Sequence, residues 1–278
     1  MPKTIKKSAI ILDGKALAEK IKLDIRKEII KLPSPPGLAA ILVGDDAASK
    51  IYLRLKEKAA QEIGINFHKY LGNNDCCPSV SEKELLSMIE FLNNDPATNG
   101  IIVQLPLPKK FNTEKIIGTI DPKKDVDGFH PRNKTGIIPP TIAAVIELLK
   151  ATGEDLARKD TLIIGKNDIF TKGLAKYLSA ELKIKKIAET KAINETAKKA
   201  DIIIIALGQA GALKKNLIKA GAIVIDVGIN KAGDKTIGDA DPAVAESAGW
   251  ISPVPGGVGP LTVACLLKNT YLLTQANK

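Results

Sequence analysis

Short, wholly apolar runs alternate along this chain with longer segments in which apolar residues recur at helical spacing. The short runs predict strands, and the periodic segments predict helices. Predicted strands cover residues 38–43, 67–71, 100–104, 161–164, 184–188, 201–206, 222–227 and 250–252, and predicted helices cover residues 15–31, 47–63, 81–92 and 261–274. Segments of helical period separate most of the later strands as well. Apolar strands joined by helices indicate parallel sheets covered on both faces, so the pattern predicts an α/β fold.

The length and the hydrophobic content of the chain predict two domains. With 278 residues, 45% of them hydrophobic, the chain can bury a full core and divide in two. Because only 4% of the residues are aromatic, the core is predicted to consist mainly of Ile, Leu, Val and Ala. The proline-rich stretch 131–140 is the best candidate for a hinge between the domains.

The predicted helix 47–63 carries one charged residue on its apolar face. At about 100° per residue, one arc of this helix holds Tyr52, Leu55, Lys56, Ala59, Ala60 and Ile63. In one interpretation, Lys56 buries its aliphatic stem and extends its ammonium group to water. In the other, Lys56 is desolvated beside Tyr52, and its pKa is lowered toward use as a proton carrier. The helix alone leaves both interpretations open.

Three polar clusters lie at the carboxyl ends of predicted strands in the first half of the chain. The first is the turn at Gly44, which leads into the helix just described, the second is Gln104, and the third is the pair Asp125 and Asp127. In open parallel sheets, ligands bind outside the carboxyl ends of the strands. Each cluster alone is also typical of a strand cap or an Asx turn. Three clusters at one edge of one predicted sheet favour a binding site.

The positive charge of the chain does not indicate a nucleic-acid partner. A net charge of +10 permits contact with nucleic acid, a membrane surface or an anionic ligand. However, only four of the 41 basic residues are Arg, and the lysines are interleaved with acidic residues. No nucleic-acid-binding motif accompanies them. The charge is therefore interpreted as solvated faces, and no nucleic acid is expected as a partner.

The sequence predicts neither a disulfide framework nor a metal site nor a membrane span. The three cysteines, Cys76, Cys77 and Cys265, and the two isolated histidines lack metal-ligand spacing. No uncharged apolar stretch reaches the roughly 18 residues that a membrane span needs. The expected protein is reduced, metal-free and cytoplasmic, with no membrane partner.

Four motifs occur in order along the chain: Tyr-Leu-Arg-Leu-Lys at 52–56, Val-Gln-Leu-Pro-Leu-Pro at 103–108, Asp-Val-Asp-Gly-Phe at 125–129, and Pro-Val-Pro-Gly-Gly-Val-Gly-Pro-Leu-Thr at 253–262. With the segments 223–230 and 238–239, they make the chain resemble the bifunctional methylenetetrahydrofolate dehydrogenase/methenyltetrahydrofolate cyclohydrolase family (FolD type) over nearly its whole length. The resemblance implies two α/β domains with a cleft between them. A folate-binding catalytic domain is expected at 1–138, joined by the C-terminal helix 260–278, and a Rossmann-like, parallel-sheet NAD(P)-binding domain at 139–259.

The resemblance also implies a role for each polar group of the first domain. Lys56 corresponds to the catalytic lysine of the family, and Gln104 to the glutamine that orients it. Tyr52 corresponds to the tyrosine that lines the pterin site, and Asp127 to the carboxylate that grips the pterin ring. A carboxylate suits that role because it accepts two hydrogen bonds from the amino and N–H groups of the ring. Further substrate contacts are expected from Leu105, Pro255, Gly256 and Gly257.

The implied chemistry has two steps. A hydride leaves the methylene bridge of the substrate, 5,10-methylenetetrahydrofolate, for the nicotinamide of NADP. Water then attacks the methenyl carbon, and the ring opens to 10-formyltetrahydrofolate. Lys56 is expected to handle the proton transfers of this hydrolytic step. The resemblance further implies a homodimer built on the second domain.

The dinucleotide turn departs from the family pattern, which is Gly-Arg-Ser, two variable residues, Val-Gly, one variable residue and Pro. Here the stretch reads Gly165-Lys-Asn-Asp-Ile-Phe-Thr-Lys-Gly173, and it still leads into a helix whose N-terminal amides can meet a pyrophosphate. The Cβ of Thr171, in place of the second glycine, is expected to crowd the approach of the cofactor. The alternative function is therefore a cyclohydrolase with weak or lost dehydrogenase activity. The expected cofactor-binding residues are Gly165, Lys166, Asn167, Thr171, Gly208, Gly228, Ile229 and Thr262.

Two features leave the choice between NADP and NAD open. Glu189 can hydrogen-bond a ribose hydroxyl and disfavours a 2′-phosphate, whereas Lys166 and Lys191 favour that phosphate. NADP is the expected cofactor, and NAD is possible. The linker between Asn133 and Thr141 is also shorter than in the family, and Pro139-Pro-Thr-Ile142 replaces the motif that follows it there, a further departure on the cofactor side.

Overall fold

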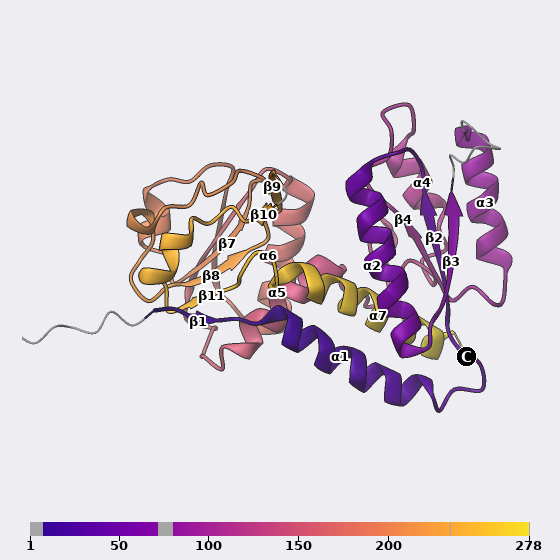
Figure 1. The fold of residues 1–278 in the computed structure, drawn as a ribbon, viewed down its shortest axis with the longest axis horizontal. Coiled ribbons are helices and arrows are strands. Elements are labelled where there is room, and N and C mark those ends of the chain that lie inside the picture. The colour runs from indigo at the N-terminus through magenta and orange to yellow at the C-terminus, as the bar shows by residue number, and fades with distance from the viewer. Residues whose placement is uncertain (1–7, 72–79, 234, 278) are drawn as a thin grey trace, which may run out of the picture. The chain divides into compact units, whose positions relative to one another are not determined.

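The computed structural model describes residues 8–71, 80–233 and 235–277, and Figure 1 shows their helices and strands. The chain divides into two compact units. The six-stranded unit is formed by the residues up to Leu17 and by Thr141–Thr262, and the three-stranded unit by Ala18–Pro140 and Val263–Lys278. Two helices, α1 (Gly14–Ile29) and α7 (Val258–Ala276), begin in the six-stranded unit and end in the three-stranded unit.

Residues 8–17 lie in a different unit from the one expected. β1 (Ile10–Ile11) pairs in parallel with β11 (Trp250–Ile251) at the edge of the six-stranded sheet. Just before β1, the Ala9 N–H donates to the Ala245 carbonyl at 2.8 Å. The unit expected to begin at residue 1 therefore begins at Ala18. A two-residue strand offers too few positions for a periodic pattern, so the sequence does not reveal it.

The sheet of the three-stranded unit has the order β3-β2-β4, and its strands are parallel: β2 is Gly37–Leu42, β3 is Asn66–Leu71 and β4 is Gly100–Val103. Successive residues of a strand point to opposite faces of its sheet. Alternate residues at β2 accordingly belong to two apolar clusters: Leu38, Ala40 and Leu42 to one, and Ala39, Ile41 and Val43 to the other. Helices α2 (Ala47–Ile63) and α7 contribute to the first cluster, and α3 (Glu82–Asn94) and α4 (Thr113–Thr119) to the second.

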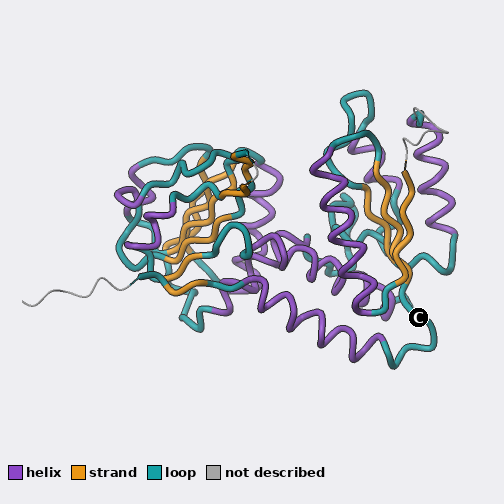
Figure 2. The backbone as a smooth tube through the Cα atoms, viewed as in Figure 1, coloured by secondary structure: helices purple, strands orange, loops and turns teal. Residues whose placement is uncertain are grey.

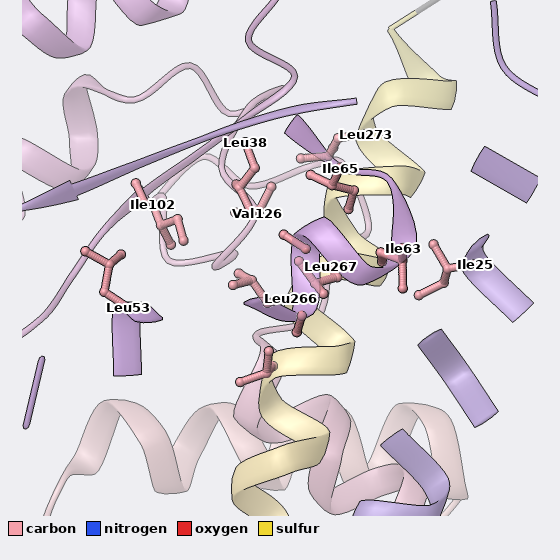
Figure 3. Packing of buried hydrophobic residues seen from close by; sticks show 14 of the residues in the cluster. Ile25, Leu38, Leu53, Ile63, Ile65, Ile102, Val126, Leu266, Leu267 and Leu273 are labelled. Carbon is pink, nitrogen blue, oxygen red and sulfur yellow. The ribbon is translucent and has the colours of Figure 1, made fainter. Parts of the chain in front are cut away.

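Figure 3 shows the buried side chains of the first cluster. Leu53 and Ile63 come from α2, and Leu266 and Leu267 come from α7; each is at most 3% exposed. Fully burying such a side chain contributes about 1.5–3 kcal/mol. This packing fixes the rotation of α2 about its own axis, and so it decides which other side chains of α2 are buried.

The ends of α2 and α3 are set by local capping residues. The Asp46 carboxylate accepts the Ser49 N–H at 2.7 Å at the start of α2, and Gly64, with φ +85°, ends that helix in the left-handed conformation. Ser81 and Glu84 form a reciprocal capping box at the start of α3. The predicted range 47–63, which rests on the apolar period, agrees with the observed helix.

The sheet of the six-stranded unit has the order β1-β11-β8-β7-β5-β6, with all strands parallel. Its longer strands are β5 (Asp160–Gly165), β6 (Lys186–Thr190), β7 (Ile202–Ala206) and β8 (Ile223–Asp226). Figure 2 shows the strands of each sheet side by side. The chain runs from β5 to β6 on one side and then returns to β7 on the other, so the strand order reverses next to β5. Ligands of such sheets bind at the carboxyl ends of the strands, at this reversal.

The two faces of the six-stranded sheet are covered by different kinds of structure. Helices α5 (Pro140–Ala151) and α6 (Asp168–Leu182) lie on one face, as Figure 1 shows. The other face packs on loops and on the 3₁₀ turns η1 (Glu195–Lys198) and η3 (Pro242–Glu246). Helical segments are predicted between most of these strands, but the connection after β6 contains only η1, and the connection after β7 only η2 (Lys215–Leu217).

Two further elements are not predicted by the sequence pattern. One is α4, with 7 residues, and the other is the antiparallel hairpin of β9 (Asn230–Ala232) and β10 (Lys235–Ile237), with 3 residues in each strand. Elements of this length complete too few periods to be distinguished from a loop.

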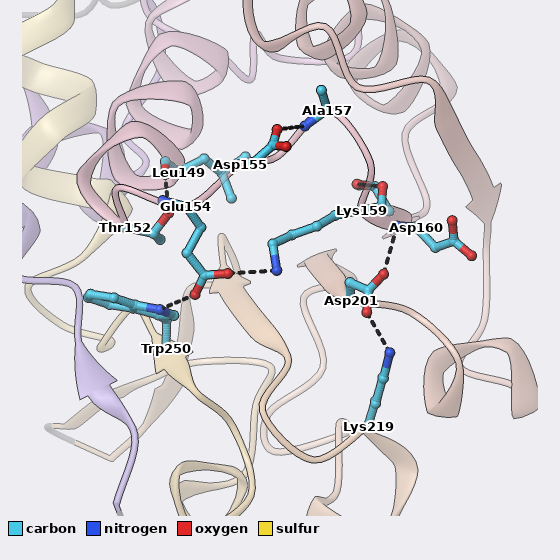
Figure 4. Close-up of polar contacts among 11 residues, drawn as sticks. Leu149, Thr152, Glu154, Asp155, Ala157, Lys159, Asp160, Asp201, Lys219 and Trp250 are labelled. Atoms are coloured by element: carbon cyan, nitrogen blue, oxygen red, sulfur yellow. Dashed lines mark hydrogen bonds and ion pairs between the residues drawn. The ribbon is translucent and has the colours of Figure 1, made fainter.

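Polar contacts tie together the amino ends of the six-stranded sheet (Figure 4). The Trp250 Nε1–H donates to Glu154 at 2.6 Å, and Glu154 also pairs with Lys159 at 2.6 Å. Asp201, just before β7, accepts the Asp160 N–H at 2.9 Å. These carboxylates are engaged in structural contacts, and they lie at the end of the sheet opposite to the expected ligand site.

Within the described residues, no helix is both long and apolar enough to cross a bilayer. The same residues contain no group of three His, Cys, Asp or Glu side chains placed as metal ligands. Cys265 is buried in α7, whereas Cys76 and Cys77 lie outside the described residues.

Candidate active site

Lys56 lies at the centre of the buried face of α2. The buried residues of this helix are Ser49, Leu53, Lys56, Ala59, Ala60 and Ile63. At about 100° per residue, Lys56 falls in the middle of their arc, and only 7% of it is exposed. The helical wheel predicts Leu55 on this face, which is wrong, because Leu55 is 51% exposed and Leu53 is buried in its place. Leu53 rather than Leu55 packs against the sheet, so the buried face of α2 is centred on Lys56.

Gln104 holds the terminal nitrogen of Lys56. The Lys56 Nζ donates to Gln104 Oε1 at 3.0 Å. Gln104 follows β4, and its backbone N–H donates to the Ile41 carbonyl at 2.8 Å, which fixes it to β2. Its Nε2 donates to the Leu105 carbonyl at 3.0 Å, so its oxygen is the atom directed at Lys56. The interpretation in which Lys56 extends its ammonium group freely to water is therefore excluded.

The carboxylates of Asp125 and Asp127 have different surroundings. Asp125 is 2% exposed and accepts the N–H groups of Gly128 at 3.0 Å and His130 at 2.7 Å. It also forms a parallel bridge with Ile101, which places this segment beside β4. Asp127 is half-buried, and no described residue donates a hydrogen bond to its carboxylate. Asp125 therefore shapes the turn, while the oxygens of Asp127 are available to a ligand.

Burial moves the pKa values of Lys56 and Asp127 toward each other. Desolvation lowers the pKa of Lys56, and the charge of Asp127 opposes this shift. Desolvation raises the pKa of Asp127 to about 6, opposed by the charge of Lys56 and assisted by that of Asp125. In both groups the loss of solvent outweighs the mutual attraction. The site thus contains a lysine that loses its proton more easily than usual, next to a carboxylate that gains one more easily.

Tyr52 and Leu105 adjoin this cluster. Tyr52 lies one turn before Lys56 on α2, and it packs on the apolar cluster shown in Figure 3. Burial raises the pKa of its phenol, which therefore stays neutral and can donate a hydrogen bond. Leu105 is half-buried, is joined to Pro106 by a cis peptide bond and receives the Gln104 side chain on its carbonyl. Residues from α2, from the end of β4 and from the Asp125 turn thus meet within the three-stranded unit.

The other predicted substrate residues, Pro255, Gly256 and Gly257, belong to the six-stranded unit, between β11 and α7. Gly256 has φ +110°, and its carbonyl accepts the Lys15 N–H at 2.9 Å. A Cβ on Gly14 would lie 1.9 Å from the Gly257 carbonyl oxygen. Gly14 is therefore required where the start of α1 meets this motif. The sequence pattern does not reveal this requirement, because the contact joins opposite ends of the chain.

The turn after β5 leads directly into α6, and Asn167 caps that helix. The Asn167 side chain accepts the N–H groups of Ile169 at 3.0 Å and Phe170 at 3.1 Å. Two of the amides predicted to meet a pyrophosphate are therefore engaged by a side chain of the protein itself. A phosphate at this helix end has to compete with Asn167 or use the remaining donors of the turn.

Thr171 is accommodated inside the protein. It is 3% exposed, and its methyl group lies 2.8 Å from the position that a Cβ on Gly165 would take. The absence of a side chain at Gly165 thus leaves the space that Thr171 fills. The methyl group is directed at Gly165 rather than into the solvent beside the turn.

Other predicted cofactor residues follow the carboxyl ends of β7 and β8. Gly208 has φ +64°, and no atom lies within 4 Å of the position its Cβ would take, so the space beside it is open. Gly228 and Ile229 follow β8, and Ile229 is 54% exposed. Thr262 instead lies in α7, where its hydroxyl donates to the Val258 carbonyl at 3.0 Å.

Two exposed lysines extend from neighbouring strand ends. β5 and β6 pair with Ile164 opposite Thr190, so Lys166 and Lys191 follow adjacent strands. Lys191 pairs with Asp168, in the first turn of α6, at 2.9 Å. Glycines permit close approach of a ligand to the backbone, and cations bind phosphates. The strand ends of this unit therefore fit a dinucleotide.

Comparisons with known proteins identify a family for each of the two parts of the chain. Residues 12–127 match the family model described as "Tetrahydrofolate dehydrogenase/cyclohydrolase, catalytic domain", and residues 139–278 match "Tetrahydrofolate dehydrogenase/cyclohydrolase, NAD(P)-binding domain". The bifunctional protein FolD of a Nitratiruptor species is 43% identical over 282 residues, which cover 96% of this chain and 99% of that protein.

Solved structures agree with this family. The bifunctional FolD enzyme of Campylobacter jejuni has a TM-score of 0.91 and 38% identity, with 98% of this chain and 100% of that chain covered. The methylenetetrahydrofolate dehydrogenase-cyclohydrolase of Trypanosoma brucei, complexed with NADP cofactor and an inhibitor, has a TM-score of 0.88 and 30% identity, with 98% and 99% covered. The present chain therefore belongs to the tetrahydrofolate dehydrogenase/cyclohydrolase family, and its second family match is an NAD(P)-binding domain.

Proposed function

We propose that this chain catalyses both reactions for which its family is named. In the first, a hydride leaves the methylene carbon of 5,10-methylenetetrahydrofolate, and bound NAD(P) supplies the hydride acceptor. In the second, water attacks 5,10-methenyltetrahydrofolate, and the ring opens to 10-formyltetrahydrofolate. The chain is thus a bifunctional dehydrogenase and cyclohydrolase of one-carbon folate metabolism.

The observation that carries this proposal is the contact of 3.0 Å between Lys56 Nζ and Gln104 Oε1 on the buried face of α2. A protein that only binds folate has no need for a lysine whose charged form is destabilised by burial. A proton carrier does, because its pKa has to approach the working pH. Gln104 accepts a hydrogen bond from the amino group of Lys56. The lone pair of a neutral Lys56 therefore points away from Gln104, where it can accept a proton.

In the hydrolytic step, the neutral amino group of Lys56 accepts a proton from water as the water oxygen bonds to the methenyl carbon. The protonated Lys56 then gives a proton to the ring nitrogen whose bond to that carbon breaks. As the C–N bond breaks, the added hydroxyl group loses its proton to the solvent and becomes the formyl carbonyl, so the net reaction consumes one water and releases one proton. Asp127, whose charge favours the protonated lysine, stabilises Lys56 between these transfers.

Asp127 and Tyr52 hold the substrate in this mechanism. The Asp127 carboxylate accepts two hydrogen bonds from the amino and N–H groups of the pterin ring, for which its oxygens are available. Tyr52 presents the face of a half-buried ring to the pterin. Leu105 and the backbone at Pro255, Gly256 and Gly257 complete the proposed set of substrate contacts.

The alternative function, a cyclohydrolase with weak or lost dehydrogenase activity, depends on the altered turn at Gly165. Two observations favour the bifunctional interpretation. Thr171 is buried against Gly165, so its bulk does not stand in the solvent beside the turn. The space beside Gly208 is open. Gly165, Lys166, Gly208, Gly228 and Ile229 are the residues that we propose for holding the dinucleotide.

Within NAD(P), we propose NADP as the cofactor, because Lys166 and Lys191 provide two cations at adjacent strand ends. Replacing Lys191 with alanine is expected to raise the KM for NADP about tenfold, since one charge-assisted hydrogen bond to the 2′-phosphate is lost. The KM for NAD should change less than twofold. Steady-state kinetics with both cofactors measures this difference, and Lys185→Ala, at an exposed lysine before β6, serves as the control. Equal effects of Lys191→Ala on the two cofactors would contradict the assignment.

The resemblance to the family supports two further proposals, a homodimer and a cytoplasmic location. Light scattering during gel filtration tests the first. A mass near the 29.6 kDa of one chain would rule the dimer out.

The whole function is tested with purified protein and two substrates. Given methylenetetrahydrofolate, the protein is expected to reduce NADP, and to reduce NAD more slowly. Given methenyltetrahydrofolate without a dinucleotide, it is expected to release 10-formyltetrahydrofolate. Hydrolysis without reduction of either cofactor would establish the alternative function, and absence of both reactions would refute the proposal.

A further inference from the structure

Two buried carboxylates that have no part in the chemistry above lie near the carboxyl ends of β7 and β8. Asp226 is the last residue of β8 and is 2% exposed, and Asp239 follows β10 and is fully buried. Taking a carboxylate out of water is costly unless hydrogen bonds replace the lost solvent. The partners of these two side chains therefore indicate what the carboxylates do.

The Asp239 carboxylate gathers three successive backbone amides of the loop after β7. It accepts the N–H groups of Leu207 at 2.6 Å, Gly208 at 3.0 Å and Gln209 at 2.6 Å. The Asn230 side-chain amide donates a fourth hydrogen bond at 2.9 Å. Successive amides that converge in this way form a concave site for anions. Here the protein's own carboxylate fills that site and fixes the conformation of the loop.

The Asp226 carboxylate connects the loop after β8 to the segment that carries Asp239. It accepts the N–H groups of Gly228 at 2.9 Å, Asp239 at 3.1 Å and Ala240 at 2.7 Å. The backbone N–H of Asp226 donates to the Ser252 hydroxyl at 2.8 Å. Asp226 thereby holds Asp239 in place relative to β8.

Two glycines make room for the two carboxylates. A Cβ on Gly228 would lie 2.2 Å from the carboxyl carbon of Asp239, and a Cβ on Gly238 would lie 2.0 Å from an oxygen of Asp226. The Asp239 carboxylate thus lies where a side chain at position 228 would be, and the Asp226 carboxylate lies where a side chain at position 238 would be. The loops after β7 and β8 and the segment after β10 are interlocked as one body.

We propose that Asp239, anchored by Asp226, is a positioning residue of the dinucleotide site, which holds the Gly208 and Gly228 loops in the conformation that binds the cofactor. Asp239 does not contact the cofactor, since it is fully buried. It accepts hydrogen bonds from three backbone amides of the Gly208 loop and so fixes that loop. The space beside Gly208 is open, and the loop lies where the strand order reverses next to β5. This inference rests on the proposed dehydrogenase function and adds residues to the same site.

The test compares the affinity of the full-length wild type and of Asp239→Asn for NADP by titration calorimetry. Asparagine keeps the shape of aspartate, but its amide nitrogen cannot accept a hydrogen bond, so some of the four donors lose their acceptor. We expect the Kd for NADP to rise about 30-fold. Hydrolysis of methenyltetrahydrofolate, which uses no dinucleotide, should stay within twofold of the wild type. Asp241→Asn, at a more exposed carboxylate two residues away that pairs with Lys214, is the control and should leave the Kd unchanged.

Two results would overturn the inference: an unchanged Kd in folded Asp239→Asn, or a loss of hydrolysis as large as the loss of affinity, which indicates a general structural role. If Asp239→Asn does not fold, Asn230→Ala removes only one of the four donors. It should then raise the Kd about threefold with hydrolysis intact, and an unchanged Kd again overturns the inference. A wild type that binds NADP without reducing it refutes the dehydrogenase function alone, because the comparison of Kd values still decides the role of Asp239. A wild type that binds neither NADP nor NAD refutes both.

Discussion

Replacing Lys56 with methionine is expected to lower the rate of methenyltetrahydrofolate hydrolysis about a thousandfold, within the range that a positioned proton carrier contributes. Methionine has nearly the length and volume of the lysine stem, so the packing of α2 on the sheet is preserved. It has no group that can accept a proton from water or return one. The loss should appear in kcat, because the substrate contacts of Asp127 and Tyr52 remain.

The same variant should be as stable as the wild type or more so. Lys56 is 7% exposed, and burying a charged group costs several kcal/mol that its partners repay only in part. Urea denaturation measures the free energy of unfolding, and rapid kinetics measures hydrolysis. Lys58→Met, at an exposed lysine of the same helix, is the matched control and should keep hydrolysis within twofold. A folded Lys56→Met protein with full hydrolytic activity would exclude the proposed role.

The candidate site was predictable from the sequence where local signals decide it. The 3.6-residue period predicts α2 and its bounds, and an apolar run that ends in a polar residue predicts the place of Gln104 at a strand end. The strand ends of a parallel sheet share one edge, and for this reason α2, Gln104 and Asp127 could be expected to meet. The wheel alone could not choose between Leu53 and Leu55, because that choice depends on the sheet against which the helix packs.

Features that join distant parts of the chain could not be predicted. The pairing of β1 with β11, the contact of Gly14 with Gly257 and the interlocked Asp226 and Asp239 all depend on tertiary contacts between remote segments. The replacement of the family's second glycine by Thr171 suggested crowding at the cofactor. In the structure, the Thr171 methyl group lies against Gly165, in space that is free because Gly165 has no side chain. A departure from the pattern, Thr171, is thus accommodated by a glycine of the pattern that the chain keeps, Gly165.

Replacing Asp127 with asparagine is expected to weaken folate binding and to stabilise the fold. The wild-type carboxylate offers two acceptors to the pterin, whereas asparagine offers one acceptor and one donor. Losing one charge-assisted hydrogen bond, about 2 kcal/mol, corresponds to a KM for methylenetetrahydrofolate that is about 30-fold higher. In the wild type, KM should also rise as the pH falls below about 6, where this carboxylate becomes protonated. The variant should lose that dependence.

The difference in free energy of unfolding between the wild type and Asp127→Asn should depend on pH, because the Asp127 carboxyl titrates in the wild type alone. Because folding raises the pKa of Asp127 from 3.8 to about 6, the folded state holds the proton more tightly than the unfolded state. Its ionisation therefore lowers the stability of the wild type as the pH rises through that interval. Asp127→Asn avoids this loss, so its advantage in free energy of unfolding should be near zero at pH 3.5 and about 3 kcal/mol above pH 6.5. Urea denaturation at the two pH values measures it, with Asp45→Asn, at an exposed carboxylate after β2, as the control. If Asp127→Asn lowers both the affinity for folate and the free energy of unfolding at neutral pH, Asp127 supports the fold rather than holding a ligand. A residue that is retained for binding is expected to make the wild type less stable than the variant.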